Sequence, residues 1–127
     1  MPLDRIDHVN IRTRDIAATA AFFRDVLGLE VRDPPRLDPA RFQWVYTAAG
    51  AAVVHITIDP AAPDHAVPRG VGGLDHAAFT CSDLAGMRVR IDALGISYRV
   101  LERPDKTLTQ LFVTEPNGTL LELNFPG

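Results

Sequence analysis

The stretch LDHAAF at residues 74–79 decides the fold, because its pattern has already appeared as IDHVNI at residues 6–11. In both copies an aliphatic residue, an aspartate and a histidine open an alternating run. A second aspartate, Asp15 or Asp83, follows seven residues after the histidine. Self-similarity at a fixed offset is the mark of a repeated structural unit. We therefore interpret the chain as two copies of one module.

The two halves stay in nearly constant register along their length. Two identical pairs, His8/His76 and Asp15/Asp83, are 68 positions apart. Two others, Gly28/Gly95 and Gln43/Gln110, are 67 positions apart. At the same offset of 67, His55 matches Glu122 in ligand type. Four identities together with one order of elements are more than chance would supply.

Hydrophobic periodicity predicts a strand, a helix and three further strands in each half. In the first half we expect strands at 4–13, 29–33, 41–47 and 52–58, and a helix capped by Asp15 and ended by Gly28. In the second half we expect strands at 74–81, 96–102, 108–114 and 120–125, a helix from Ser82 or Asp83 to Gly95, and a tight turn at 115–118. The Pro- and Gly-rich residues 59–73 are expected to form a linker.

Composition limits the class of protein. A chain of 127 residues with 46% hydrophobic and 23% charged residues is typical of a single globular domain. A net charge of −3, with acidic and basic residues mixed along the chain, argues against nucleic acid and membrane surfaces as partners. The single cysteine, Cys81, excludes an internal disulfide, and the N-terminus has no signal-peptide pattern. We expect a cytoplasmic protein.

Strand alternation predicts which side chains face away from the helices. Apolar pairs such as Val9 and Ile11, or Leu121 and Leu123, should pack under the helices. The side chains left on the opposite, polar face are His8, Asn10, Arg12, His55, Thr57, His76, Thr80, Glu122 and Asn124. A polar concave face beneath a helix layer suggests a ligand cavity.

Three imidazoles and one carboxylate on that face, from His8, His55, His76 and Glu122, predict one divalent metal ion. Nickel, zinc, cobalt, iron and manganese remain open. Asn10, Arg12, Thr57 and Asn124 are candidates for substrate binding, although hydrogen bonding between strands is an equal alternative for Asn10 and Arg12.

Other residues have a plain structural reading beside any functional one. The alternating Phe42, Trp44 and Tyr46 fit either core packing or a cavity wall. Cys81 is expected in the core, and His65 at the surface of the linker.

At these residues the sequence resembles the vicinal oxygen chelate superfamily, which includes glyoxalase I, methylmalonyl-CoA epimerase, extradiol dioxygenases, fosfomycin-modifying enzymes and bleomycin-binding proteins. The resemblance covers nearly the whole chain. It rests on IDHV at 6–9, FFRDVLGL at 22–29, LDH at 74–76 and EPNGTLLE at 115–122.

The resemblance implies an α+β fold in which two tandem βαβββ modules, about 4–59 and about 74–127, form an open, curved mixed sheet around a metal cavity, with the helices on the outer face. It also implies a homodimer. The metal-binding positions of the family match His8, His76 and Glu122, while His55 stands where glyoxalase I has a glutamate.

Three functions follow as hypotheses. The first is a metal-dependent lyase or isomerase on a small oxygenated metabolite, in which Glu122 moves a proton next to a carbonyl. The second is an Fe(II) extradiol dioxygenase that uses His8, His76 and Glu122 as a two-histidine, one-carboxylate triad. The third is a metal-free protein that binds a drug or a metabolite. Substrate specificity is expected to lie in the loops 34–43, 59–73 and 103–109.

Overall fold

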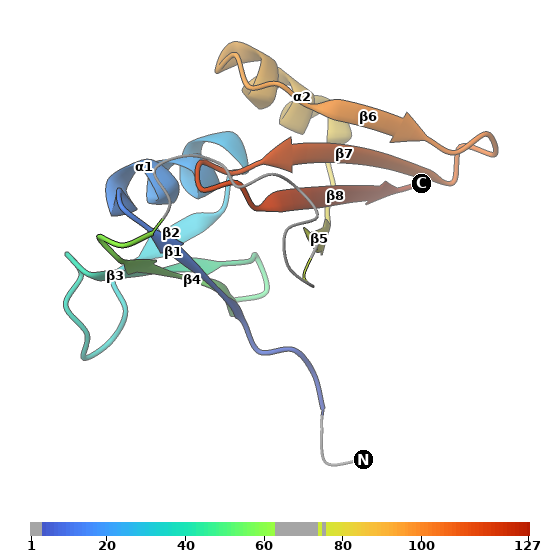
Figure 1. Ribbon diagram of the computed structural model, residues 1–127. Coiled ribbons are helices and arrows are strands. Elements are labelled where there is room, and N and C mark those ends of the chain that lie inside the picture. The colour runs from blue at the N-terminus through green and yellow to red at the C-terminus, as the bar shows by residue number, and fades with distance from the viewer. Residues whose placement is uncertain (1–3, 63–73, 75) are drawn as a thin grey trace. The chain divides into compact units, whose positions relative to one another are not determined.

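A computed structural model describes residues 4–62, 74 and 76–127 of the chain. The chain divides into two compact units, Met1–Pro63 and Asp64–Gly127, and each contains one four-stranded mixed sheet (Figure 1). This is the α+β architecture of two tandem modules that the sequence predicts. His65, which was expected at the surface of the linker, and Asp75 of the second repeat lie outside the described residues.

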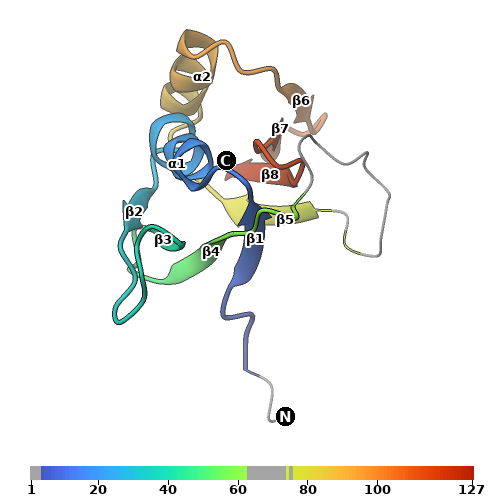
Figure 2. The same cartoon turned by 60° about the vertical axis from the view of Figure 1, so that its left-hand side comes forward.

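The first unit follows the predicted order of elements. It contains β1 (Val9–Thr13), α1 (Ile16–Ala21), η1 (Phe22–Val26), β2 (Glu30–Arg32), β3 (Phe42–Tyr46) and β4 (Ala52–Ile58). The sheet order is β1-β4-β3-β2, with β1 parallel to β4 and the other pairs antiparallel. Helix α1 packs against β3 and β4, on the face where Ile11, Val45 and Ile56 are buried (Figure 2).

The first helix begins as predicted but changes its winding. The Asp15 side chain caps it by accepting a hydrogen bond from the Ala18 amide at 3.0 Å. From Phe22 onward it widens into a π-helix, in which the Leu27 amide donates to the Phe22 carbonyl at 3.3 Å. The wider turn accompanies the burial of two adjacent pairs of apolar residues, which are Phe22, Phe23, Val26 and Leu27. The predicted helix between Asp15 and Gly28 is therefore present, with a π-helical second half that the sequence did not predict.

The second unit repeats the order of the first. It contains β5 (His76–Thr80), α2 (Leu84–Ala93), β6 (Arg99–Glu102), β7 (Leu108–Thr114) and β8 (Leu120–Pro126). The sheet order is β5-β8-β7-β6, with β5 parallel to β8. Asp83 caps α2 through the Gly86 amide at 3.0 Å. Leu111, Val113, Leu121 and Leu123 are buried and form the apolar side of the sheet.

Strand lengths agree with the predictions best where a strand has a neighbour on each side. Both β4 and β7 have the predicted bounds, whereas β1 starts at Val9 and not at residue 4. In the sheet of its unit β1 has only β4 beside it, and their register begins at Val9 opposite Val54. The exposed residues 4–8 have no strand partner among the described residues. Within the described part of the chain, no helix is long and apolar enough to cross a membrane.

Candidate metal and substrate site

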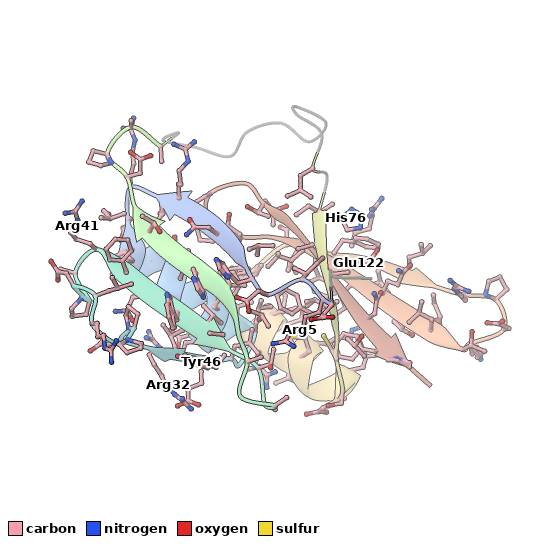
Figure 3. All side chains as sticks on the ribbon, turned by 90° about the horizontal axis from the view of Figure 1, so that it is seen from below. Arg5, Arg32, Arg41, Tyr46, His76 and Glu122 are labelled. Carbon is pink, nitrogen blue, oxygen red and sulfur yellow. The ribbon has the colours of Figure 1, made fainter. Side chains whose placement is uncertain are left out.

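The polar face of the second unit carries a histidine and a glutamate from neighbouring strands. In the parallel pair β5–β8, Ala78 stands opposite Glu122 and Thr80 opposite Asn124. Because alternate residues of a strand point to the same side, His76, Glu122 and Asn124 share one face, opposite the buried Leu121 and Leu123. Figure 3 labels both side chains on the strands of the second unit. The side chains of His76 and Glu122 are 35% and 17% exposed, so both remain accessible to a small ligand.

The spacing between these two side chains fits a shared metal ion. His76 Nε2 lies 3.9 Å from Glu122 Oε1. Nitrogen and oxygen ligands bind a divalent ion at about 2.0–2.2 Å, so two donors of one ion are at most roughly 4.4 Å apart. The pair therefore lies within the span of a single ion.

The carboxylate of Glu122 is held by neighbouring amides. Asn124 Nδ2 donates to Glu122 Oε2 at 3.0 Å, and Gln110 Nε2 donates to Asn124 Oδ1 at 3.0 Å. Asn124 was predicted as a substrate-binding residue. Its amide contacts both Gln110 and Glu122.

In the first unit, His8 has a carboxylate partner. His8 Nδ1 lies 2.7 Å from Asp7 Oδ2, and this hydrogen bond is the main cause that lowers the pKa of Asp7. With Nδ1 engaged, Nε2 is the nitrogen left for a ligand. Metal-bound histidines commonly have this second carboxylate contact.

His55 is stacked between two aromatic rings. Its ring lies parallel to that of His8, with centroids 3.6 Å apart and planes inclined by 10°. On the other side Trp44 lies at 4.3 Å and 12°. Burial, and then the charge of His8, lower the pKa of His55 and favour the neutral imidazole. Since Trp44 stands opposite His55 on the polar face, the aromatic residues of β3 fit the cavity-wall alternative better than the core alternative.

This stacking bears on the predicted set of four ligands. The lone pair of an imidazole nitrogen lies in the plane of its ring, so two stacked parallel rings direct their lone pairs along separate planes. Coordination of one ion by His8 and His55 together would require the two rings to leave this stack. Across residues 4–62, 74 and 76–127, no three His, Cys, Asp or Glu side chains are gathered as a metal-binding group.

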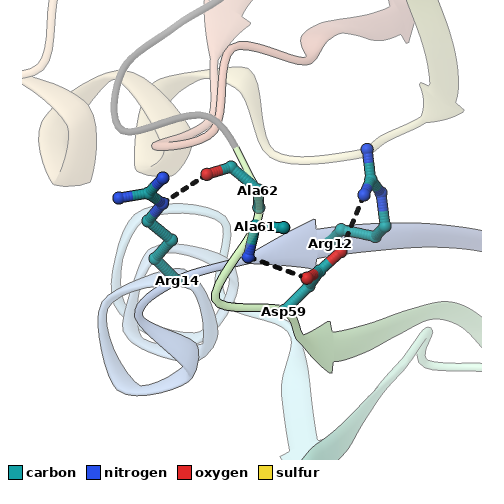
Figure 4. Close-up of polar contacts among 5 residues, drawn as sticks. All are labelled: Arg12, Arg14, Asp59, Ala61 and Ala62. Carbon is teal, nitrogen blue, oxygen red and sulfur yellow. Dashed lines mark hydrogen bonds and ion pairs between the residues drawn. The ribbon is translucent and has the colours of Figure 1, made fainter.

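The remaining predicted substrate residues of the first unit have partners on neighbouring segments. Asn10 Nδ2 donates to Thr57 Oγ1 at 3.0 Å across β1 and β4. Arg12 Nη1 donates to Asp59 Oδ2 at 2.7 Å, and the other oxygen of Asp59 accepts from the Ala61 amide at 2.9 Å (Figure 4). These contacts match the alternative of hydrogen bonding between strands and loops.

The two glutamines that match in the sequence lie on opposite faces of their sheets. Gln110 stands opposite Asn124 on the polar face, while Gln43 stands opposite the buried Ile56 and donates to Asp33 Oδ1 at 2.8 Å. The strands β3 and β7 correspond at an offset of 68, since Trp44 faces His55 as Phe112 faces Glu122. Their identity at an offset of 67 was therefore a coincidence, and Gln43 does not line the polar face.

One cation on the polar face was not predicted from the sequence. The Arg99 guanidinium lies 4.6 Å from the centroid of the Phe112 ring, and Phe112 stands opposite Glu122. Arg32, which matches Arg99 at an offset of 67, lies over Tyr46 but is neutralised by Glu30 at 2.7 and 2.8 Å. No carboxylate of the described residues forms an ion pair with Arg99. At that offset Glu30 corresponds to Ser97. The sequence alone could therefore have shown that Arg99 lacks the glutamate that Arg32 has two residues before it.

Two tandem modules, each with a mixed sheet that turns polar side chains away from the buried face, define a class of small proteins built by duplication of one unit. The chain belongs to the Glyoxalase/Bleomycin resistance protein/Dioxygenase superfamily, whose family model matches residues 5–123. The resemblance seen in the sequence is thereby confirmed.

Solved structures share this fold over almost the full length of the chain. A glyoxylase/bleomycin resistance protein/dioxygenase domain from Frankia sp. EAN1pec has a TM-score of 0.79 at 18% identity, over 98% of this chain and 93% of that one. A glyoxalase/dioxygenase from Nostoc punctiforme has a TM-score of 0.77 at 16% identity, over 99% and 93%. The fosfomycin resistance protein FosX of Listeria monocytogenes has a TM-score of 0.71 at 16% identity, over 98% and 95%. No curated protein sequence matches the chain.

Proposed function

We propose that this protein is a metal-dependent enzyme that moves a proton next to a carbonyl of a small oxygenated metabolite, as a glyoxalase-like lyase or isomerase. The observation that carries the proposal is the pair of His76 Nε2 and Glu122 Oε1, 3.9 Å apart on one face of the second unit. A histidine and a carboxylate at this spacing supply two donors to one divalent ion. His8, whose Nε2 is left available by its contact with Asp7, is the third proposed ligand.

The metal would be nickel, zinc, cobalt, iron or manganese, all of which accept imidazole and carboxylate ligands. When bound, such an ion polarises a carbonyl of a substrate that chelates it through adjacent oxygens. Glu122 is the proposed proton acceptor, because it is the only carboxylate in the predicted ligand set. Asn124 orients the carboxylate of Glu122, which is largely buried. This burial favours transfer of a proton from a bound substrate over transfer from water.

Arg99 is the proposed partner of an anionic group on the substrate. Arg99 is exposed and lies over Phe112, which stands opposite Glu122 in the register of β7 and β8. It has no carboxylate partner among the described side chains. Arg12, the cation first expected in this role, is paired with Asp59. A small metabolite with a carboxylate or a phosphonate near its two chelating oxygens would suit this face.

A second candidate function is ring cleavage of a catechol by Fe(II). The same three ligands, His8, His76 and Glu122, suit it if His55 stays stacked between His8 and Trp44. Two histidines and one carboxylate with open positions are typical of non-haem Fe(II) oxygenases. We further propose that the protein is a homodimer in the cytoplasm, which light scattering and cell fractionation would test.

Metal analysis of the purified chain, followed by a substrate panel, tests these proposals. The panel contains α-keto thiohemiacetals, catechols and fosfomycin, each with nickel, cobalt, zinc, manganese or Fe(II). Turnover of a thiohemiacetal that Glu122→Gln abolishes would support the first proposal. Oxygen uptake with a catechol and Fe(II) alone would support the second in its place. A chain that holds no divalent ion and gains none would overturn both, and leave a binding protein.

A further inference from the structure

Three polar side chains form a continuous hydrogen-bonded chain across β7 and β8. Gln110 Nε2 donates to Asn124 Oδ1, and Asn124 Nδ2 donates to Glu122 Oε2, each at 3.0 Å. Gln110 stands directly opposite Asn124 in the antiparallel register, and Asn124 lies two residues after Glu122 on the same face of β8. All three side chains are half-buried, so water competes with these bonds less than it would at the open surface.

The order of donors and acceptors fixes the direction of the Asn124 amide. A primary amide presents an acceptor at one end and donors at the other. Because Gln110 donates to the oxygen of Asn124, the nitrogen of Asn124 faces Glu122. The reverse orientation would place a carbonyl oxygen against the carboxylate and a second amide nitrogen against Gln110. Gln110 therefore supports the orientation of Asn124 that turns its amide donor toward the carboxylate of Glu122.

The same contact divides the two oxygens of Glu122 between different neighbours. Oε2 is engaged by Asn124, while Oε1 is the oxygen measured at 3.9 Å from His76 Nε2. The terminal torsion of a glutamate is broad and intrinsically permits many orientations. A donor on one oxygen restricts this torsion and keeps the other oxygen on the side of the histidine.

The first unit has no such hydrogen-bonded chain at the matching positions. There Thr57 takes the place of Asn124 and accepts a hydrogen bond from Asn10, and Phe42 takes the place of Gln110. The amide chain is thus specific to the half that carries the carboxylate, which a general requirement of the fold would not explain.

We propose that Asn124 and Gln110 are positioning residues, which hold Glu122 in the orientation that binds the metal ion; this inference rests on the proposed function. Asn124 acts directly on the carboxylate, and Gln110 acts through Asn124. Neither residue is proposed to touch the ion.

The test measures the dissociation constant of Co²⁺ or Zn²⁺ for the full-length chain by competition with a chromophoric chelator. The variants are Asn124→Leu and Gln110→Leu, with Thr80→Val as the matched control, because Thr80 is the register partner of Asn124 on the same face of β5. Loss of a residue that orients a ligand typically weakens metal binding by about 10–100-fold, which is the effect expected of both leucine variants. Thr80→Val should leave the dissociation constant unchanged, and circular dichroism verifies that each variant folds.

A second background separates positioning from a general structural effect. If Asn124 acts through the carboxylate, Asn124→Leu should add little to the affinity already lost in Glu122→Gln, so the two effects should not be additive. Additive losses would mean that Asn124 acts elsewhere. Should Asn124→Leu fail to fold, Gln110→Leu decides, because it removes the support and keeps the Asn124 amide.

The outcomes distinguish this inference from the proposed function. Wild-type affinity in both leucine variants, together with lost affinity in Glu122→Gln, would overturn the positioning role and leave the metal proposal standing. A wild-type chain that binds no divalent ion would overturn the proposed function and the inference with it.

Discussion

The imidazole rings of His8 and His55 lie parallel, with their centroids 3.6 Å apart. Trp44 covers the other side of His55 at 4.3 Å, so three aromatic rings form one stack on the polar face of the first unit. A histidine in this position contributes both faces of its ring to packing. The stack therefore gives His55 a packing role beside the ligand role that the sequence predicts for it.

The first prediction concerns His55→Phe, which keeps an aromatic ring between Trp44 and His8 but removes both nitrogens. We expect the affinity for a divalent ion to change little. In His8→Ala, by contrast, the loss should exceed the roughly 100-fold that removal of a residue orienting a ligand costs. Isothermal titration with Zn²⁺ or Ni²⁺ measures both. Equal losses in the two variants would show that His55 is a ligand and that the stack opens when the metal binds.

The second prediction concerns the buried carboxylate of Glu115, which is 1% exposed. It accepts hydrogen bonds from the amide and the side chain of Asn117 at 3.0 and 2.9 Å, and from the Thr119 amide at 3.0 Å. Glu115→Ala should lower the free energy of unfolding by about 1–3 kcal/mol, because three half-buried donors lose their acceptor. Urea denaturation measures this change.

The matched control for Glu115 is Glu102→Ala, an exposed carboxylate on β6. Its unfolding free energy should stay within about 0.5 kcal/mol of the wild type. Because the turn at Glu115 precedes β8 and fixes its register, Glu115→Ala should also weaken metal binding through Glu122. Unchanged stability would mean that the turn forms without the buried carboxylate.

Period-two alternation was enough to predict which faces of the strands are polar, because one face of each sheet is buried. From the sequence alone, it placed Glu122 opposite Leu121 and Leu123, and both leucines are buried. The cap at Asp15 was equally predictable, because a short acidic side chain before an apolar periodic run is a preferred N-cap. For the second helix the sequence left Ser82 and Asp83 open, and the structure has Asp83 as the cap.

Contacts between side chains on that face were not predictable, because they depend on the register between strands. The shift at Val45 and Tyr46 in the β3–β4 pair shows how a local irregularity breaks a constant sequence offset. An offset of 67 therefore matched Gln43 to Gln110, although the two lie on opposite faces of their sheets. The partner of Arg12 was missed for a similar reason, since Asp59 is 47 residues away in the chain.

The third prediction concerns Cys81, which lies just after β5 and is half-buried. Burial disfavours the thiolate and raises the pKa of the thiol. In the folded chain, the pH midpoint of iodoacetamide alkylation should lie above the roughly 8.5 of a free cysteine, and in urea it should return to that value. A folded-state midpoint at or below that of the unfolded chain would contradict the burial of the thiol.

The raised pKa of the Cys81 thiol also makes the stability of the fold depend on pH. Because the folded state keeps the thiol protonated, the unfolded state releases its proton first as the pH rises through about 8.5. The contribution of Cys81 to stability is therefore complete below that pH and declines above it. Cys81→Ala should remove this part of the alkaline loss, which thermal melts between neutral and alkaline pH would measure.

The fourth prediction separates Arg12 from substrate binding. The Ala61 amide, and then Arg12, lower the pKa of Asp59. Arg12→Gln should therefore raise the pKa of Asp59 toward its ordinary value, as followed by NMR titration of the carboxyl carbon. Because a lowered carboxyl pKa stabilises the fold only above the unfolded value, the variant should lose stability mainly at neutral pH and less in acid. The Michaelis constant for substrate should not change, and an increase would return Arg12 to the substrate site.

The fifth prediction concerns Arg99, whose guanidinium lies over Phe112 with no carboxylate partner among the residues described. Arg99→Gln should raise the Michaelis constant of carboxylate or phosphonate substrates by about 10-fold or more, since a hydrogen bond to a charged group contributes about 1.5–3 kcal/mol. Neutral substrates should be unaffected. The matched control is Arg32→Gln, because Arg32 also lies over an aromatic ring, that of Tyr46, but is already neutralised by Glu30. An equal effect of both variants, or an equal effect on charged and neutral substrates, would show that Arg99 acts on the fold or the general field of the protein and does not bind the substrate anion.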